Sequence, residues 1–540
     1  MASRSAHTDT FAADNLPPRE AWPEFVFGLP ELRYPEKLNA AKALLDDMVS
    51  DRPAVHTSSG VWTYRDLLER ANRIARVLTE DMGLVPGNRV LLRAANTPEL
   101  IAARCGVLKA GGVVVATMPL LRTSELVKVI GKAQISHALT DSRLTEDLEA
   151  ARAEESVLRH VMTFGLEGEL EERMASKSPD FETVETSAED VAIIAFTSGT
   201  TGDPKGCMHS HRDLLAVCDT FGKRVLDAKP DEIFTGTPPL AFTYGLGGYT
   251  LFPMRVGAST LPIEKPGPDD LIEAIERGAT TVFTAPTAYR ALLEKVGEAD
   301  ISSLKKCVSA GESLPKATSE EWFERTRIRI IDGIGSTEML HIFISSSGEA
   351  VRPGSTGKPV PGYEAMVVGD DMRPLPPGEI GKLAAKGPTG CRYLDDPRQA
   401  EYVVGGWNLT GDAYVVDEDG YFWFQARTDD MIVASGYNIS GPEVEAALVG
   451  HEAVAECAVV ASPDEERGTV VKAFVVAGEG VSTGQPLAEE LQSFVKANLA
   501  PYKHPRVVEF VDELPKTPTG KIQRFHLRER ERAGARGSRP

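Results

Sequence analysis

The chain has 540 residues, 42% of them hydrophobic and 26% charged, which is the composition of a folded globular protein rather than a disordered or membrane-spanning one. Such a length exceeds what one hydrophobic core usually supports, so two or more domains are expected. The formal net charge of -20 argues against nucleic acid as the main partner, because a phosphate backbone favours a basic face.

The N-terminal twenty residues lack the continuous apolar stretch of a secretory signal, and no run of residues reaches membrane-spanning length. The six cysteines lie far apart without a Cys-x-x-Cys pair, so neither a zinc site nor a disulfide framework is indicated. We therefore expect a cytoplasmic protein without a membrane span.

The first part of the chain alternates predicted helices and strands. Thr63 and Asp66 form a capping-box pattern that opens a helix, and Ser210 and Asp213 repeat the pattern later. Apolar runs predict strands at 89–92, 113–115, 191–196, 281–284 and 328–331, and further helices at 98–109 and 288–295. Strands separated by helices with short joints are typical of parallel sheets.

The pattern changes after about residue 355, where prolines and glycines interrupt short apolar segments and indicate a small barrel-like subdomain. A second boundary lies near 427–430, beyond which helical and strand patterns alternate in a small α+β domain. The predicted fold class is α/β. A large N-terminal domain of doubly wound α/β subdomains and the barrel-like subdomain would span 1–428, and a small mobile C-terminal domain would span 429–540.

The most informative motif is the ten-residue stretch 197–206, T-S-G-T-T-G-D-P-K-G, which directly follows a predicted strand. Its three glycines allow tight turns, its four hydroxyl side chains and its backbone N–H groups can surround phosphate oxygens, and Lys205 adds positive charge. This density argues against an ordinary surface loop. A Walker-type P-loop is excluded, because Pro204 and Gly206 stand where that motif needs glycine and a hydroxyl.

This loop resembles the signature of the superfamily of acyl- and aryl-CoA synthetases, luciferases and peptide-synthetase adenylation domains. Further blocks of that superfamily follow in order at 333–338, 410–412, 426–430 and 515–521, so the resemblance covers nearly the whole chain. Each block alone is weak, but their order and separation are specific. The resemblance implies an enzyme that uses ATP and Mg²⁺ to activate a carboxylic acid as an acyl-AMP and then transfers the acyl group to coenzyme A.

The resemblance also implies residue roles. Glu338 would be the magnesium carboxylate beside Thr337, a phosphate hydroxyl, because carboxylate oxygen suits hard Mg²⁺. Asp412 would accept hydrogen bonds from both ribose hydroxyls, with Arg427 as its partner. The candidate nucleotide and coenzyme A contacts are Thr197, Ser198, Gly199, Thr200, Thr201, Gly202, Lys205, Gly311, Glu312, Ser313, Asp332, Gly333, Asp412, Arg427 and Gly436.

Lys521 resembles the lysine that bridges the acid's carboxylate and the α-phosphate, where charge is greatest in the transition state. Because Lys521 belongs to the small C-terminal domain, that domain would have to close over the large one. Asp429 resembles the hinge residue whose torsions would swing the domain between adenylating and thioester-forming poses.

Two segments, 238–247 and 333–341, resemble the acid pocket of the benzoate and 2-aminobenzoate CoA ligase branch. The substrate candidates are Ala241, Phe242, Tyr244, Gly245, Ile334, Gly335 and His341. Small apolar and aromatic walls suit a flat ring, whose burial supplies most of the binding. His341 could hydrogen-bond the carboxylate or a ring substituent, with a structural histidine as the alternative.

The chain departs from the superfamily pattern at three positions. Ile334 replaces a tyrosine that stacks on adenine in many members, Ala426 replaces a glycine, and Val433 replaces a frequent lysine. The first departure is shared by the aryl branch and supports placement there. The last leaves open how the small domain would hold coenzyme A.

Several alternatives stay open. The acid could be a bulkier alicyclic, terpenoid or fatty acid, or the acceptor a carrier protein loaded in trans. A fused peptide-synthetase module is disfavoured, because only residues 522–540 follow Lys521. A non-catalytic nucleotide-binding protein would be expected to lack Lys521, Glu338 or Asp412, and all three are present. A homodimer is a further expectation.

Overall fold

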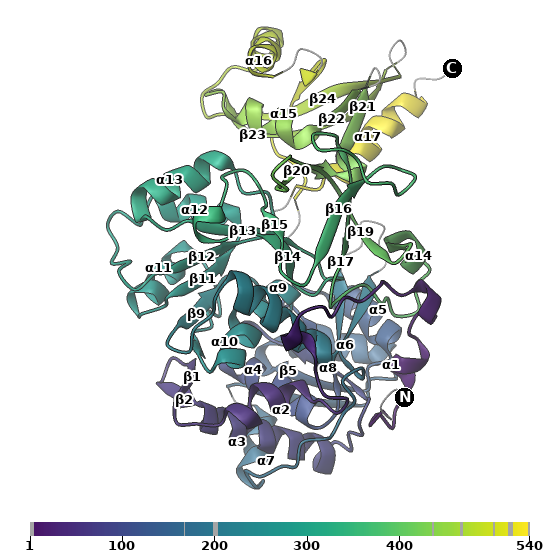
Figure 1. The fold of residues 1–540 in the computed structure, drawn as a ribbon, viewed down its shortest axis with the longest axis vertical. Coiled ribbons are helices and arrows are strands. Elements are labelled where there is room, and N and C mark those ends of the chain that lie inside the picture. Colours follow the sequence, from purple (N-terminus) through teal and green to yellow (C-terminus); the bar gives the residue numbers. More distant parts are fainter. Residues whose placement is uncertain are drawn as a thin grey trace. The chain divides into compact units, whose positions relative to one another are not determined.

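The computed structural model describes residues 5–166, 168–197, 204–434, 437–464, 468–499, 503–516 and 522–537. The chain divides into two compact units (Figure 1). The first comprises residues 1–365 and 385–408, and the second comprises residues 366–384 and 409–540.

The first unit contains a nine-stranded sheet whose order is β15-β14-β13-β12-β11-β9-β10-β1-β2. Its strands are β1 (Pro53–His56), β2 (Val61–Thr63), β9 (Ile233–Gly236), β10 (Ser259–Thr260), β11 (Thr281–Thr284), β12 (Lys306–Ser309), β13 (Ile330–Gly335), β14 (Ile342–Ser345) and β15 (Lys358–Pro359). The inner neighbours from β1 to β13 run parallel, and the two outer ends pair antiparallel. Three helices alternate with β11, β12 and β13, namely α11 (Pro268–Glu276), α12 (Pro286–Leu293) and α13 (Lys316–Thr326).

A second sheet of the same unit has six strands in the order β6-β5-β3-β4-β7-β8. The strands are β3 (Arg89–Arg93), β4 (Val113–Thr117), β5 (His137–Asp141), β6 (His160–Phe164), β7 (Val191–Thr197) and β8 (Lys205–Ser210). All neighbours are parallel except the hairpin pair β7 and β8. The associated helices are α3 (Tyr64–Arg76), α4 (Pro98–Lys109), α5 (Thr123–Ala133), α6 (Thr145–Glu154) and α7 (Glu169–Ala175).

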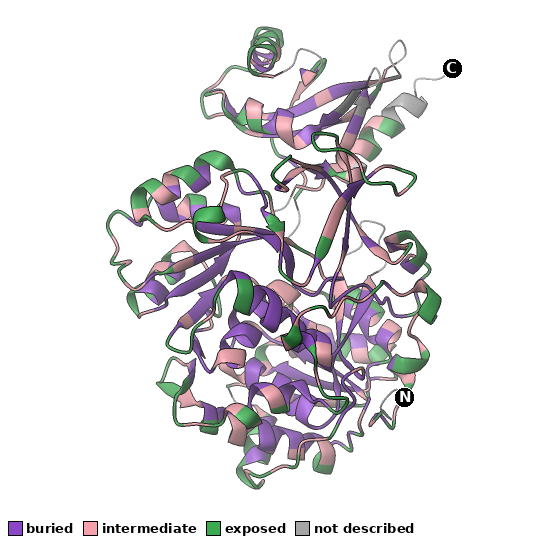
Figure 2. Cartoon of the chain, in the orientation of Figure 1, coloured by how far each residue is buried: buried purple, intermediate pink, exposed green. Residues whose placement is uncertain are grey.

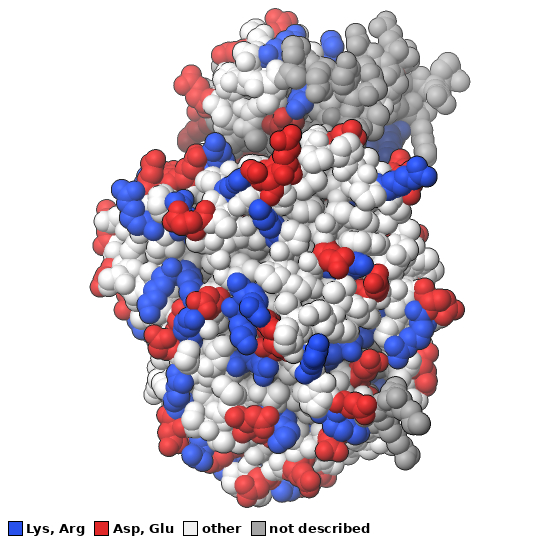
Figure 3. All heavy atoms as spheres, viewed as in Figure 1, with Lys and Arg blue, Asp and Glu red and all other residues white. Residues whose placement is uncertain are grey.

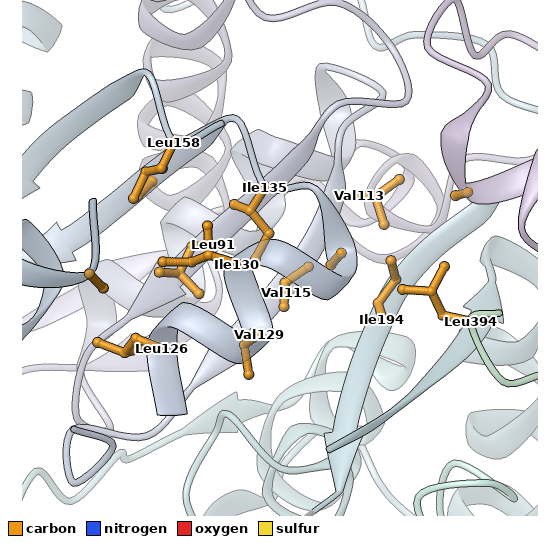
Figure 4. Close-up of a cluster of buried hydrophobic side chains, with 14 of the residues drawn as sticks. Leu91, Val113, Val115, Leu126, Val129, Ile130, Ile135, Leu158, Ile194 and Leu394 are labelled. Atoms are coloured by element: carbon orange, nitrogen blue, oxygen red, sulfur yellow. The ribbon is translucent and has the colours of Figure 1, made fainter. Parts of the chain in front are cut away.

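The core of this second sheet forms where apolar helix stripes meet buried strand residues. Leu126, Val129 and Ile130 follow the helical spacing on α5 and pack with Leu91 and Val115 of the sheet (Figure 4). Figure 2 shows most strands of the first unit as buried, whereas the edge strand β2 and the outer faces of the peripheral helices are partly exposed. The predicted parallel α/β architecture is therefore confirmed.

Short helices complete the first unit. They are α1 (Phe11–Asp14), α2 (Ala40–Leu44), α8 (His211–Val217), α9 (Thr243–Leu246), α10 (Phe252–Val256) and α14 (Gln399–Tyr402), with the π-helical turns η6 (Cys218–Val225) and η7 (Gly247–Leu251).

Both predicted capping boxes are present. Thr63 caps α3, where the backbone N–H of Thr63 donates to Asp66 at 2.8 Å and that of Asp66 donates to Thr63 Oγ1 at 3.1 Å. Ser210 and Asp213 exchange the same two bonds at the start of α8. One predicted strand is displaced: β13 begins at Ile330 rather than 328, because Arg327 takes a left-handed conformation that ends α13 immediately before it.

The two capping boxes differ in burial, which gives a stability test. Asp213 is fully buried and forms an ion pair with the buried Arg392, whereas Asp66 lies in an exposed box. Replacing Asp213 by Asn leaves Arg392 charged without its partner, so we expect the free energy of unfolding to fall by about 3–5 kcal/mol. The matched Asp66→Asn change should cost about 1 kcal/mol. Urea unfolding of both variants measures the difference, and equal losses would contradict the role of the buried pair.

The second unit begins with strands of a five-stranded sheet that is ordered β16-β17-β19-β18, with β20 paired to β19. These strands are β16 (Glu364–Val368), β17 (Gly381–Lys386), β18 (Val403–Val404), β19 (Trp407–Val416) and β20 (Phe422–Arg427). They account for the short strands that the proline- and glycine-rich stretch predicts. Residues 364–365, 385–386 and 403–408 of this sheet belong to the first unit.

The C-terminal part of the second unit is α+β, as predicted. A two-stranded sheet of β21 (Met431–Ala434) and β22 (Tyr437–Ser440) precedes a three-stranded sheet of β23 (Val454–Asp464), β24 (Gly468–Ala477) and β25 (Val507–Phe510). The helices are α15 (Gly441–Val449), α16 (Gln485–Asn498) and α17 (Arg524–Gly537). Val444, Val459 and Leu491 belong to its apolar core.

On the face that Figure 3 draws, the acidic residues are not gathered in one patch. On the face drawn in Figure 3, lysine and arginine side chains are interspersed with aspartate and glutamate. Across the residues that the structure describes, no helix combines the length and apolar character needed to cross a bilayer.

Candidate active site

The candidate site residues of the first unit gather where parallel strands end. Strands β9, β11, β12 and β13 are parallel neighbours, so their carboxyl ends lie at one edge of the nine-stranded sheet. Segment 237–247 follows β9, segment 310–313 follows β12, and segment 336–341 follows β13. Thr237 follows β9 and Thr284 ends β11, and their Oγ1 atoms are hydrogen-bonded at 2.6 Å. This bond joins the carboxyl ends of the two neighbouring strands. Open α/β sheets bind ligands at this edge.

Glu338 is buried at this edge, with 6% of the residue exposed. Its Oε1 accepts a hydrogen bond from Tyr393 Oη, and Lys205 Nζ lies 3.7 Å from the same oxygen. Lys205 Nζ also donates to Tyr393 Oη at 2.9 Å. Glu338 Oε2 has no protein partner within the described ranges. One carboxylate oxygen is thus held by the protein while the other is available to a cation.

A buried histidine, His209, hydrogen-bonds to the backbone of Thr337. His209 Nε2 donates to the backbone oxygen of Thr337 at 2.7 Å, and His209 Nδ1 lies 3.9 Å from Asp213 Oδ2. The buried ion pair between Asp213 and Arg392 anchors this support. The backbone at Thr337 is therefore held by His209, 128 positions away in the sequence.

The ends of the candidate phosphate loop are brought together by the β7–β8 hairpin, in which Thr197 pairs with Lys205. Thr197 Oγ1 is buried and has no hydrogen-bond partner in the described part of the chain. Ser198, Gly199, Thr200, Thr201 and Gly202 lie outside the described residues, as do Gly436 and Lys521.

Five candidate nucleotide contacts lie just after β12 or within β13, namely Gly311, Glu312, Ser313, Asp332 and Gly333, and Ser309 of β12 is in register with Asp332 of β13. Burial raises the pKa of the Asp332 carboxyl to about 7, and Asp332 Oδ1 has no hydrogen-bond partner among the described residues. Gly311 has a φ of +91°, which favours glycine, and it precedes Glu312 and Ser313. Gly333 packs tightly on β14, because an added Cβ would lie 2.6 Å from Ile342 Cγ2.

His341 lies within a cluster of aromatic rings. Its ring centroid is 4.7 Å from Phe252, 5.4 Å from Phe221, 5.7 Å from Tyr244 and 6.4 Å from Phe283. Burial lowers the pKa of His341 to about 3, so its ring is neutral at physiological pH. Because Nε2 donates to the Tyr244 backbone oxygen at 3.3 Å, the proton resides on Nε2. Nδ1 is then an acceptor, and it has no partner in the described structure.

The predicted acid-pocket segments approach each other closely. His341 Nε2 lies 3.3 Å from the Tyr244 backbone oxygen, and an added Cβ on Gly247 would lie 2.3 Å from His341 Cδ2, so the two segments are in contact. Within the second segment, an added Cβ on Gly335 would lie 2.8 Å from the His341 backbone. Tyr244 Oη donates to the backbone oxygens of Thr284 and Val308 at 3.2 and 3.1 Å. The structure thus brings together Tyr244, Gly245, Gly335 and His341.

The remaining substrate candidates are less enclosed. Ala241 and Ile334 are half-buried, and Ile334 pairs with Ile344 across β13 and β14. Phe242 is 39% exposed, and among the described residues no ring stacks against it. Its predicted place in the wall of the pocket stays a prediction.

Two polar residues that the sequence did not single out hold the segment that follows β9. Asn96 Oδ1 accepts from the Leu240 N–H at 2.7 Å, while Asn96 Nδ2 donates to the Pro238 oxygen at 3.2 Å. The buried Arg104 donates to the Leu240 oxygen at 2.7 Å. An asparagine three residues after the end of β3 and an arginine in the middle of the mostly apolar α4 are the local signals for them.

The ribose candidates lie in the second unit. Asp412 on β19 is in register with Arg427 on β20, and Arg427 Nη1 donates to Asp412 Oδ1 at 2.9 Å. Asp412 is buried, whereas Arg427 is exposed. The predicted pair is therefore in contact. Asp429, the predicted hinge residue, lies in the 3₁₀ turn Thr428–Asp430 that leads to β21.

The parallel sheets and the polar groups at their carboxyl edge define a nucleotide-dependent α/β enzyme. The AMP-binding enzyme family matches residues 46–392 and its C-terminal domain matches residues 443–521, so the chain belongs to the AMP-binding enzyme family. It is an AMP-forming acid–thiol ligase that uses ATP, Mg²⁺ and coenzyme A.

Known proteins and a solved structure match this chain over most of its length. It is 36% identical to the benzoate–CoA ligase of Thauera aromatica over 515 residues, covering 92% of this chain and 97% of the relative. It is 33% identical to the mouse mitochondrial acyl-coenzyme A synthetase ACSM3 over 532 residues, covering 93% and 92%. The crystal structure of the anthranilate CoA ligase AuaEII with anthranoyl-AMP matches with a TM-score of 0.87 at 33% identity, covering 94% of this chain and all of that one.

Proposed function

We propose that this ligase activates an aromatic carboxylic acid of the benzoate or 2-aminobenzoate type. The observation that carries the proposal is the group of four aromatic side chains around the neutral His341, namely Phe221, Tyr244, Phe252 and Phe283. Aromatic rings bind flat, apolar ligands through edge and face contacts. The benzoate–CoA ligase and the structure with anthranoyl-AMP support the same class of acid.

In the first half-reaction, a carboxylate oxygen of the acid attacks the α-phosphorus of ATP and pyrophosphate leaves. Lys205 and the hydroxyls of Thr197 and Thr337 would donate to phosphate oxygens, which stabilises the charge that develops there. Glu338 would hold Mg²⁺ through Oε2, and the bound ion would neutralise phosphate charge. This fits the described residues, which contain no cluster of three or more metal-ligating side chains, because Mg²⁺ commonly takes one or two carboxylates plus substrate phosphates.

In the second half-reaction, the thiol of coenzyme A attacks the acyl carbon and AMP leaves. Asp412 would hold the ribose through both half-reactions, with Arg427 keeping its carboxylate in place. Asp332 and the strip Gly311–Ser313 would contact adenine. We further propose that the small domain spans 429–540 and turns at Asp429 between the two half-reactions.

A panel of acids tests the choice of substrate. Benzoate, 2-aminobenzoate, salicylate, cinnamate and medium-chain acids are each incubated with ATP and coenzyme A, and the thioesters are identified by mass spectrometry. We expect benzoate or 2-aminobenzoate to give the highest kcat/KM. Preference for a medium-chain acid would instead favour the bulkier-acid alternative, and AMP release without a coenzyme A thioester would favour a carrier-protein acceptor.

A homodimer and a cytoplasmic location are part of the same proposal.

Ala241 offers a direct test of the acid pocket. Replacing this half-buried residue by Leu adds apolar volume beside the segment that carries Tyr244, so we expect the KM for benzoate to rise about tenfold. The control is Ala299→Leu, which adds the same volume at a half-buried position outside the segment. Steady-state kinetics compares the two variants, and an unchanged KM in Ala241→Leu would remove Ala241 from the pocket.

A further inference from the structure

Tyr393 is placed between the two charged groups of the phosphate site. Its hydroxyl donates to Glu338 Oε1 and accepts from Lys205 Nζ at 2.9 Å. Lys205 Nζ and Glu338 Oε1 are themselves 3.7 Å apart, beyond hydrogen-bond distance. The hydroxyl therefore satisfies both groups without letting them bond directly to each other.

The position of Tyr393 is fixed by its backbone and its neighbours. It is only 1% exposed, and its Cα pairs with Cys207 in an isolated bridge. The flanking bonds from Met208 N to the Arg392 oxygen and from Leu394 N to the Gly206 oxygen are both 2.8 Å. Because a carboxylate can only accept, the Tyr393 hydroxyl is the donor in its hydrogen bond to Glu338 Oε1.

The consequence follows from charge. An ammonium and a carboxylate in a buried site attract each other strongly, and a direct pair would remove both from a ligand. With the hydroxyl between them, Lys205 keeps donors for phosphate oxygen and Glu338 keeps Oε2 for a cation. Without the hydroxyl, the two side chains need to move by less than 1 Å to form a direct charge-assisted hydrogen bond.

We propose that Tyr393 is a positioning residue that keeps Lys205 and Glu338 apart, so that the site can bind ATP together with Mg²⁺. The proposal rests on the proposed function, because it takes Glu338 as the magnesium carboxylate. Tyr393 acts through these two side chains and does not touch the reacting atoms.

The test is Tyr393→Phe, which removes the hydroxyl and keeps the aromatic ring, whose centroid lies 5.8 Å from the ring centroid of Tyr402. ATP affinity is measured by calorimetry at a series of Mg²⁺ concentrations, which needs no acid to react. ATP affinity should increase with Mg²⁺, and the Mg²⁺ concentration at half of that increase measures the Mg²⁺ requirement. Because a hydrogen bond to a charged group is lost, we expect this concentration to rise about tenfold in Tyr393→Phe. Tyr402→Phe is the matched control: its hydroxyl contacts Ser336 at 3.3 Å, and the Mg²⁺ requirement should stay within about twofold.

A chain that also lacks Lys205 distinguishes the loss of separation between Lys205 and Glu338 from a general packing defect. In a Lys205→Met chain no ammonium is present to capture Glu338, so adding Tyr393→Phe should raise the Mg²⁺ requirement by less than about threefold. Should Tyr393→Phe fail to fold, Tyr393→His keeps a hydrogen-bonding ring and undergoes the same titration. A folded Tyr393→Phe protein with the wild-type Mg²⁺ response would overturn the proposal, as would an equal shift in Tyr402→Phe. Normal Mg²⁺-dependent ATP binding with no turnover of any acid would count against the proposed function alone.

Discussion

A Glu338→Gln variant is expected to form acyl-AMP from ATP and acid about 10²–10³-fold more slowly than the wild type, because charge stabilisation at the reacting phosphate is lost. Glutamine keeps the size of the side chain and can still accept from Tyr393, so the local packing is preserved. It lacks the negative charge that would hold Mg²⁺ through Oε2. Pyrophosphate release in the presence of benzoate measures the effect.

The control for Glu338 is Glu232→Gln. Glu232 is also buried, with 3% exposed, and it pairs with Lys306 at 2.6 Å in the same unit. Both changes leave a lysine near a neutral amide, so both should destabilise the fold by comparable amounts. Only Glu338→Gln should slow turnover by about 10²–10³-fold while the protein remains folded. Turnover within about threefold of wild type in Glu338→Gln, less than one kcal/mol in barrier, would contradict its role as the magnesium carboxylate.

The elements that the sequence predicted well are those whose signals are local. The capping boxes at Thr63 and Ser210 place helix starts within a few residues, and the apolar runs give β3, β4, β7 and β11. The contact between Asp412 and Arg427 is also local, because β19 and β20 pair antiparallel and bring the two residues into register. Pairs separated by fifteen residues or fewer need only one hairpin or turn to meet.

Residues that act over long sequence separations could not be predicted in the same way. Tyr393 contacts Lys205 across 188 positions, and His209 contacts Thr337 across 128. No periodicity or spacing connects these pairs: Tyr393 meets Lys205 because the 392–394 segment packs against β8, and His209 of β8 meets Thr337 through the tertiary fold. Asn96 likewise reaches Leu240 across 144 positions. The sequence named the candidate site residues and missed Tyr393, His209 and Asn96, which hydrogen-bond to them or to the segments that carry them.

The aromatic cluster was predicted in part, for the same reason. Tyr244 and His341 lie on segments with recognisable patterns, and they were expected to share a pocket. Phe221, Phe252 and Phe283 come from η6, α10 and β11, where they read as ordinary core residues. Their convergence on His341 depends on the tertiary packing of three elements. This convergence also fixes the histidine as neutral, which its place in the sequence alone does not.

Replacing Lys521 by Ala is expected to slow acyl-AMP formation by about 10²–10³-fold, because a positive charge that stabilises the transition state is removed. The reaction of supplied benzoyl-AMP with coenzyme A should change by less than about threefold, less than one kcal/mol in barrier, because in our proposal the small domain turns at Asp429 between the half-reactions and carries Lys521 away from the phosphate. The two half-reactions are therefore measured separately, the first by pyrophosphate release and the second by thioester formation from benzoyl-AMP.

Lys516 provides the control for Lys521, because it lies five residues earlier and its Nζ pairs with Glu456 at 2.7 Å within the second unit. Both of those side chains are partly exposed, so breaking the pair by Lys516→Ala should cost no more than about 1 kcal/mol of stability and leave both half-reactions unchanged. Removing either lysine lowers the charge of the C-terminal region equally, so a general electrostatic effect on ATP would appear in both variants. A selective loss of adenylation in Lys521→Ala would assign the effect to one amine at the reacting phosphate. Equal loss of both half-reactions in that variant would instead show that Lys521 supports the fold or both poses of the small domain.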